Sequence, residues 1–265
     1  QIALARIAAR ATGQGEAEEE VAAEIVEALL ERCQKGDTGE RAWASLALGL
    51  HEYKKANAGG ASSLKVRAVL VDRFRRGKNV GEVAAAAVGL GLAGEREIHR
   101  DLIREMTGGH FIVRGLYAAA LPLMKAEEAL GALRRELASE VPIPVFQREA
   151  TQALAMFRDV SLTEQMTAAI KRAESTDEQV AVLHGAMRSG ETRMVPLLLE
   201  ILNEKRLGKR KIDDRARAFA AVALGSICSR RALRWNAHLA LEVTWSAAPP
   251  TLTFEQAGGG VLDLL

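Results

Sequence analysis

Four arginines are the residues of this chain whose type and regular spacing could do chemistry. Each lies seven or eight residues before the end of a short alanine-rich segment, and together they are Arg41, Arg114, Arg148 and Arg217. A guanidinium presents a planar fork of donors that fits a phosphate or a carboxylate. A recurring arginine could therefore form a ladder that binds an anionic ligand, or it could bond to oxygens within the fold itself.

Other residues with chemical potential are scattered. The histidines are isolated from one another and from both cysteines, with no HExxH motif and no Cys-His spacing. We therefore predict no catalytic residue, no metal site and no cofactor. His184 lies four residues before the end of one alanine-rich segment, where it could face a binding groove, although a lone histidine there is more often a partly buried surface residue. Of the pair Asp213 and Asp214, we expect one to cap a helix and the other to face solvent.

The composition predicts helices. Hydrophobic residues make up 48% of the 265-residue chain, but only 4% are aromatic and six are proline. A net charge of +2 gives no overall bias toward polyanions or membranes. No stretch approaches the roughly 20 apolar residues of a membrane span, so we expect a soluble chain. It begins with Gln in what reads as the inside of a helix, which indicates a fragment or a processed form and leaves the compartment open.

An internal repeat organises most of the sequence. Aligned on their last residues, six alanine-rich segments end at positions separated by 40, 33, 33, 33 and 37 residues, namely Gly49, Gly89, Pro122, Ala155, Arg188 and Gly225. Two positions before each end stands an alanine: Ala47, Ala87, Ala120, Ala153, Ala186 and Ala223. Alanine keeps full helix propensity and lets neighbouring helices approach closely. We predict that these alanines form a packing seam.

Longer amphipathic segments alternate with the alanine-rich ones, so each repeat is predicted to be a helical hairpin. These first helices are expected over residues 16–33, 62–76, 95–106, 125–140, 161–174 and 191–205. Expected caps of the second helices are Asp37, Asn79, Asp177 and Asp213, and expected breaks are Gly36, Gly77, Gly94 and Gly190. Loops at 57–63 and 206–214 account for the two longer spacings.

The segments RAWASLALG (41–49) and DRARAFAAVALG (214–225) resemble the second-helix signature of HEAT repeats, especially the bacterial HEAT-like type also found in phycobilisome lyases. The resemblance covers about residues 1–228, with Pro122 and Arg188 departing from the glycine of the signature. It implies an all-α, right-handed α-solenoid of the HEAT/armadillo-like kind with six to seven hairpins, whose second helices line the concave side. It also implies that the recurring arginines bond carbonyls or an aspartate of an adjoining repeat and fix the stacking register.

The pattern changes after residue 228. Prolines and a glycine run appear, and Leu239, Leu241, Val243 and Trp245 alternate with other residues as in an extended segment with one buried face. We predict a helical repeat domain over 1–235 and an extended C-terminal tail over 236–265 that caps the last repeat. The alternative is a segment that pairs with, or docks on, another molecule.

The expected function is that of a non-catalytic protein-binding or scaffold module that uses the concave face and has another protein as its partner. Two alternatives stay open: a bilin lyase-like enzyme, which would bind a tetrapyrrole, and a nucleic-acid-binding HEAT-like protein, whose affinity would fall steeply with salt. The basic clusters at 73–78, 207–211 and 229–234 lack interleaved aromatics for base stacking, and 34 acidic residues balance them. Nucleic acid is therefore the less favoured partner, and no membrane partner is expected.

Overall fold

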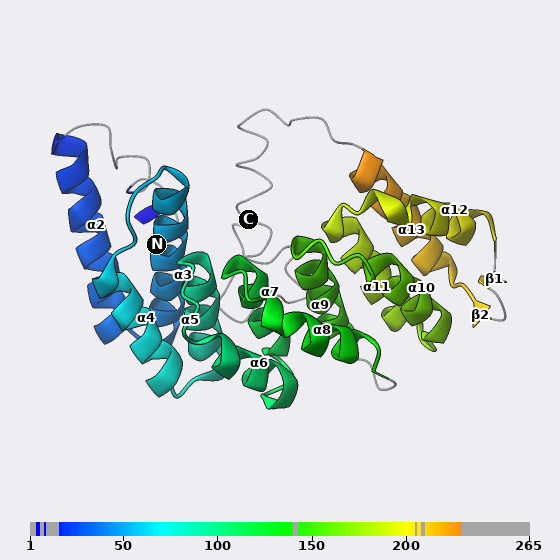
Figure 1. The fold of residues 1–265 in the computed structure, drawn as a ribbon, viewed down its shortest axis with the longest axis horizontal. Coiled ribbons are helices and arrows are strands. Elements are labelled where there is room, and N and C mark those ends of the chain that lie inside the picture. The colour runs from blue at the N-terminus through cyan, green and yellow to red at the C-terminus, as the bar shows by residue number, and fades with distance from the viewer. Residues whose placement is uncertain are drawn as a thin grey trace. The chain divides into compact units, whose positions relative to one another are not determined.

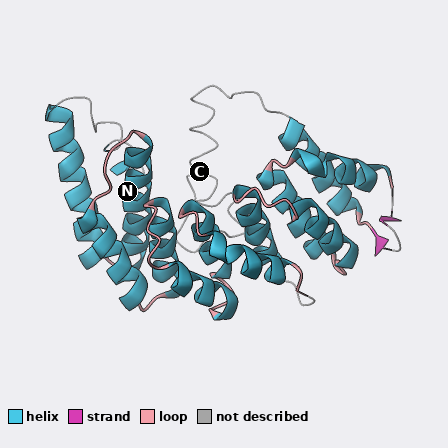
Figure 2. Cartoon of the chain, in the orientation of Figure 1, coloured by secondary structure: helices cyan, strands magenta, loops and turns pink. Residues whose placement is uncertain are grey.

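The computed structural model describes residues 4, 5, 8, 16–139, 143–204, 206–207 and 210–228. Over these residues the chain is all-α, as the sequence predicts, with twelve α-helices that pack in sequential pairs (Figures 1 and 2). None of the described helices is both long enough and apolar enough to cross a membrane. The predicted C-terminal cap, 236–265, lies outside the described residues.

The helices before residue 127 belong to one compact unit of three hairpins. The hairpins are α2 (Glu16–Lys35) with α3 (Thr38–Asn57), α4 (Leu64–Arg76) with α5 (Val80–Leu92), and α6 (His99–Gly108) with α7 (Arg114–Leu123). The second helices also pack on one another, α3 on α5 and α5 on α7. Each hairpin is thus joined to the next mainly through its second helix.

The helices from residue 127 onward belong to a second compact unit with the same plan. The pairs are α8 (Leu130–Leu137) with α9 (Pro144–Met156), α10 (Leu162–Arg172) with α11 (Thr176–Ser189), and α12 (Val195–Asn203) with α13 (Asp214–Cys228). Short 3-10 turns, Glu127–Ala129 and Thr192–Met194, precede α8 and α12. The predicted loop at 206–214 contains a two-residue antiparallel ladder, β1 (Arg206–Leu207) with β2 (Arg210–Lys211).

Three of the four predicted helix caps are confirmed. Asp37 accepts a hydrogen bond from the amide of Glu40 and forms a capping box with it. Asn79 caps α5, and the Asp213 carboxylate accepts a hydrogen bond from the amide of Arg215 in α13. Asp177 is wrong, because Ser175 caps α11 two residues earlier and Asp177 lies inside the first turn. Asp177 therefore does not cap the helix, although its negative charge in the first turn is favourable to the helix dipole.

The predicted alanine seam is confirmed, because all six alanines are fully buried. Glycines allow the closest approaches beside them. A Cβ added to Gly49 would lie 2.5 Å from Cα of Gly89, so α3 and α5 touch through their backbones. At Gly225 of α13 no described atom would lie within 4 Å of such a Cβ, and the neighbouring Val222 is exposed. The outer side of α13 is thus open within the described part of the chain.

Five second helices end on a residue in the left-handed conformation, which is a repeat that the sequence shows only in part. These residues, spaced 31 to 35 apart, are Gly59, Gly94, Lys125, Arg158 and Gly190, with φ between 56° and 82°. At each of the first four, the amide of the following residue donates a hydrogen bond to the carbonyl five residues before it, as in a Schellman motif. The chain therefore turns sharply after each of these second helices and continues into the first helix of the next hairpin.

Candidate functional site

Three of the predicted arginines bond the end of the helix before their own. The Arg41 guanidinium donates to the carbonyl of Gly36 at 3.0 Å, directly after α2. Arg217 donates to the carbonyl of Leu202, near the end of α12, at 2.8 Å. Arg114 likewise donates to a carbonyl in the last turns of α6, that of Met106. These arginines satisfy carbonyls that a helix end leaves without partners.

The other two predicted site residues have different surroundings. Arg148 is buried on α9 and its Nε donates to the carboxylate of the adjacent Glu149 at 2.9 Å. The His184 ring of α11 meets Phe219 of α13 edge to face, with ring centroids 6.4 Å apart. The five residues lie on five different second helices, α3, α7, α9, α11 and α13.

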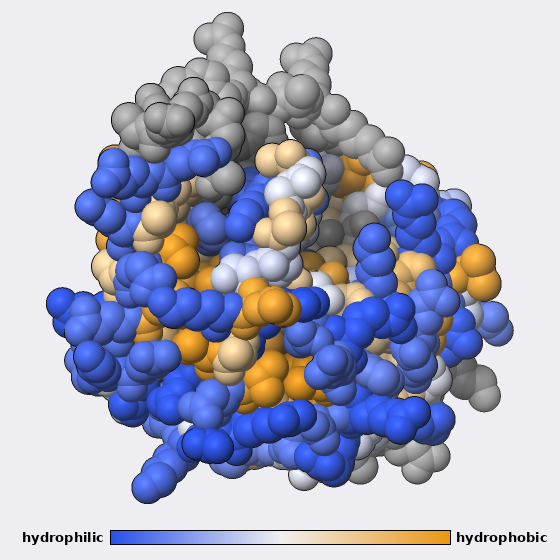
Figure 3. Space-filling model, turned by 60° about the vertical axis from the view of Figure 1, so that its left-hand side comes forward, coloured by the Kyte–Doolittle hydropathy of each residue, from blue (hydrophilic) through white to orange (hydrophobic). Residues whose placement is uncertain are grey.

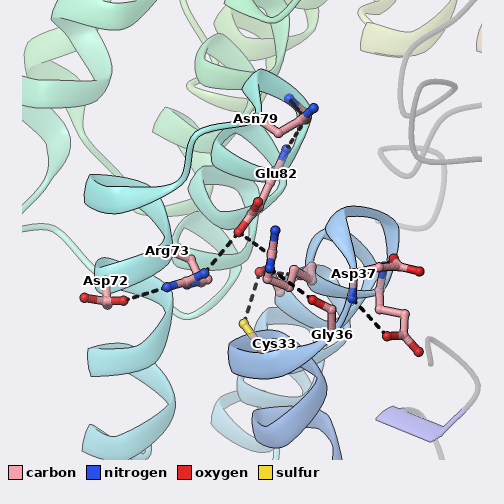
Figure 4. A network of polar contacts seen from close by, with 11 residues as sticks. Cys33, Gly36, Asp37, Asp72, Arg73, Asn79 and Glu82 are labelled. Carbon is pink, nitrogen blue, oxygen red and sulfur yellow. Dashed lines mark hydrogen bonds and ion pairs between the residues drawn. The ribbon is translucent and has the colours of Figure 1, made fainter.

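A polar network lies between the first two hairpins, where Arg73 and Glu82 point toward each other (Figure 4), and it includes Arg41. Nε of Arg41 lies 2.9 Å from Oε1 of Glu82, whose side chain is 2% exposed on α5. Arg73 of α4 donates to the same oxygen at 3.2 Å and to Asp72 at 3.0 Å. The hydrogen bond to Asp72 raises the pKa of Arg73. One carboxylate thus holds together α3, α4 and α5.

Cys33 lies at the edge of this network and offers no reactive thiol. Its Sγ is 3.4 Å from Oγ of Ser45, which donates to the carbonyl of Arg41 at 2.8 Å. Burial raises the pKa of the Cys33 thiol, and the hydrogen bond with Ser45 offsets part of this increase. A protonated, buried thiol is a poor nucleophile. Among the described residues no group of three or more His, Cys, Asp or Glu side chains could hold a metal ion.

Two acidic residues at the exits of second helices hold the next loop in place. Glu95 follows α5, and its Oε2 lies 3.0 Å from Nε of Arg67 on α4. Asp159 follows α9 and accepts two hydrogen bonds from Arg134 of α8, at 2.7 and 3.0 Å. It also accepts hydrogen bonds from the amide and hydroxyl of Ser161. Burial opposes ionisation of Asp159, but the bonds from Arg134 and Ser161 outweigh it and lower the pKa.

Large apolar side chains break the otherwise polar surface at several places. On the side of α2 and α4, Figure 3 shows hydrophobic atoms exposed between hydrophilic ones. The exposed large apolar residues of the described part are Leu4, Val21, Leu64, Val80, Phe111, Ile112, Met156, Val160, Leu199 and Val222. Scattered single residues of this kind are normal, so a cluster carries more information.

Phe111 and Ile112 are adjacent, exposed residues of the turn before α7, and we call this pair the turn patch. Phe111 is 59% exposed and Ile112 47%, and Phe111 is the one aromatic in the set above. Gly91 of α5 packs against Ala120 of α7. The patch lies directly before α7, the second helix that packs against α5.

The turn that carries Phe111 and Ile112 is held in shape. The rings of His110 and Phe111 stack with centroids 5.0 Å apart, and the amide of Ile112 donates to Nδ1 of His110 at 3.4 Å. The next residue, Val113, is buried and anchors the turn. Two large apolar side chains are thus presented to solvent at little further ordering cost on binding.

Sequence reasoning missed both the Glu82 network and the turn patch. Glu82 is the one charged residue of α5, and a lone charge on an apolar helix is a signal for a buried pair. The three apolar side chains of the GGHFIV turn, 108–113, gave a weaker signal, because sequence does not tell which of them point outward. Compared with known proteins, the chain matches no family model, no curated protein and no solved structure.

Proposed function

We propose that this chain is a non-catalytic protein-binding or scaffold module built as a right-handed HEAT-like solenoid. The sequential hairpins, the buried alanine seam and the recurring left-handed helix exits support the repeat on which this proposal rests. In such an array each repeat contacts its neighbours, and the surface along the helices serves for binding.

The turn patch is the observation that carries the proposed function. Aromatic and large aliphatic residues presented on a rigid turn are typical anchors of protein interfaces, where a few buried side chains supply most of the binding energy. The chain has six phenylalanines, and in Phe111 it exposes one of them on such a turn. The patch lies directly before α7, the kind of helix that lines the concave side in a HEAT-like solenoid. It would then form part of the rim of that side.

A quantitative pull-down from cell extract tests the proposal. The wild-type chain is compared with the double variant Phe111→Ser/Ile112→Ser and with Val160→Ser, which removes a side chain that is 80% exposed at another turn. We expect a specific protein to be retained by the wild type and by Val160→Ser and lost with the double variant. If the three chains retain the same proteins in the same amounts, the turn patch does not bind a partner.

A further inference from the structure

We propose that the outer face of α13 is a docking surface for residues 236–265 of the same chain. This contact is separate from the turn patch and does not depend on the function proposed above. It is inferred from a comparison of one repeat position in successive second helices.

That position lies four residues before the segment end, and in three repeats it contacts the next second helix. In α3 it is Ser45, whose carbonyl oxygen would lie 2.5 Å from a Cβ added to a glycine of α5. In α9 it is Thr151, whose Cβ would lie 2.7 Å from one added to a glycine of α11. In α11 it is His184, whose ring meets that of Phe219 on α13. The position therefore marks the side of a second helix that faces the following one.

On α13 this side has no partner among the described residues. Ala221 occupies the marked position and is exposed, and Gly225 is exposed at the segment end, where the equivalent Gly49 touches the backbone of α5. Together with Ala218 and Val222 they form an apolar, uncharged surface over about two turns, which we call the end face. The outermost helix of a solenoid is normally polar on its outer side, so an apolar one is expected to be covered.

The segment that follows α13 is the nearest candidate to cover the end face. Residues 229–265 continue directly from Cys228, the last residue of α13. A segment tethered by a short linker has an effective concentration in the millimolar range, which favours it over a second copy of the chain or a free partner.

The sequence of that segment fits the end face in chemistry and in length. Large apolar residues stand at every second position of the run 239–245, and an extended stretch with this pattern has one apolar side. Seven extended residues span about 23 Å, which is close to the roughly 22 Å length of the 15-residue helix α13. The small side chains of Ala218, Ala221 and Gly225 leave room for the larger ones of this run.

Photo-crosslinking in the purified full chain tests this inference. A photoreactive phenylalanine analogue replaces Val222 in the end face, and in a control chain it replaces Ala28 on the exposed side of α2. Both chains are irradiated at a low and at a high protein concentration. We expect the analogue at position 222, and not that at position 28, to react within residues 236–265 of its own chain at both concentrations.

Two double variants show which side of the run docks. Leu241→Asp/Val243→Asp puts charges on the apolar side, and Ala240→Asp/Thr244→Asp puts them on the opposite side of the same run. Burying an unpaired charge is costly, so the first variant should reduce the crosslink from position 222 on the order of tenfold. The second variant should leave it unchanged.

Hydrogen exchange of the α13 amides, in chains without the analogue, gives a second measurement. Exchange should be faster in Leu241→Asp/Val243→Asp than in Ala240→Asp/Thr244→Asp, because only the first uncovers the end face. Adducts between two chains that grow with protein concentration would overturn the inference and assign the end face to a second copy. Equal labelling of residues 236–265 from positions 222 and 28, or equal exchange in the two variants, would also overturn it.

Discussion

Arg41 Nε and Glu82 Oε1 are 2.9 Å apart, and this ion pair ties the start of α3 to the start of α5. Because Arg73 of α4 binds the same oxygen, one buried carboxylate connects two consecutive hairpins. An alanine seam alone would let parallel second helices slide along each other. We expect the pair to select one register, because it supplies a fixed point along the two helices.

Glu82→Gln keeps the shape of the side chain and removes its charge. We expect this variant to lower the free energy of unfolding by about 2 to 4 kcal/mol, because Arg41 and Arg73 lose a buried counter-charge. Urea denaturation measures the loss, and Arg41→Ala combined with Glu82→Gln should show clear non-additivity. Glu105→Gln, in a more exposed pair, serves as the control and should cost less than about 1 kcal/mol. Equal stability of Glu82→Gln and wild type would contradict a role in register.

Asp159 gives the fold a defined pH dependence. The folded state lowers the pKa of Asp159 below its ordinary value of 3.8. The ionised carboxylate therefore adds its full contribution to the free energy of unfolding above pH 3.8, and this contribution is lost as the pH falls through the lower pKa of the folded state. Asp159→Asn should therefore reduce stability at neutral pH by about 1 to 3 kcal/mol, through weakened hydrogen bonds to buried groups. The difference from wild type should shrink below about pH 4.

Thermal unfolding at a series of pH values checks the Asp159 prediction. Asp177→Asn is the matched control, since the Asp177 side chain is 78% exposed and its Oδ1 lies as far as 3.9 Å from Nη1 of Arg215. A gap between Asp159→Asn and wild type that stays constant down to the acid limit would show that the charge of Asp159 is not what stabilises the exit of α9.

Substitutions in the alanine seam should overpack neighbouring second helices. Ala120→Leu or Ala153→Leu should lower the free energy of unfolding by about 1 to 3 kcal/mol, because both positions are fully buried against adjoining helices. Ala28→Leu, on the exposed side of α2, is the control and should change little. Chemical denaturation of the three variants decides the matter, and an Ala120→Leu chain as stable as the control would rule out close packing at the seam.

Lys125 and Arg158 sit at positions where the repeat otherwise uses glycine. Their φ of 56° strains a side-chain-bearing residue, so Lys125→Gly or Arg158→Gly should raise stability by about 0.5 to 1 kcal/mol. Gly94→Ala, at the same place after α5, should lower it by a similar amount. Gly131→Ala at the second residue of α8 should be stabilising, because alanine is the better helix former there. Calorimetric melting temperatures that move opposite to these signs would contradict the left-handed exits.

The sequence predicts the hairpins well because their packing restricts residue type. An alanine two positions before each segment end marks the seam. Asp37 and Asn79 mark helix starts, because any Asp or Asn side chain at that position can accept a hydrogen bond from an amide of the first turn. The same local rule cannot choose between Ser175 and Asp177, which stand two positions apart. Nor could it find the left-handed exit at Lys125, where the usual glycine is missing.

The candidate site was harder to predict because the exposure of its residues depends on the three-dimensional structure. Phe111 and Ile112 are exposed in the turn before α7, while the next residue, Val113, is buried. The outward direction of Phe111 depends on its stacking with His110 and on the burial of Val113. Neither relation leaves a pattern in the sequence.

Site-specific photo-crosslinking at Ile112 tests the central claim most directly. A photoreactive phenylalanine analogue replaces Ile112 in one chain and Leu199, an exposed residue of α12, in a second chain as control. Both are irradiated in cells that express them, and the covalent products are identified by mass spectrometry. The account predicts a discrete adduct between position 112 and another protein, absent at position 199. No protein adduct at 112, or the same adducts at both positions, would contradict it.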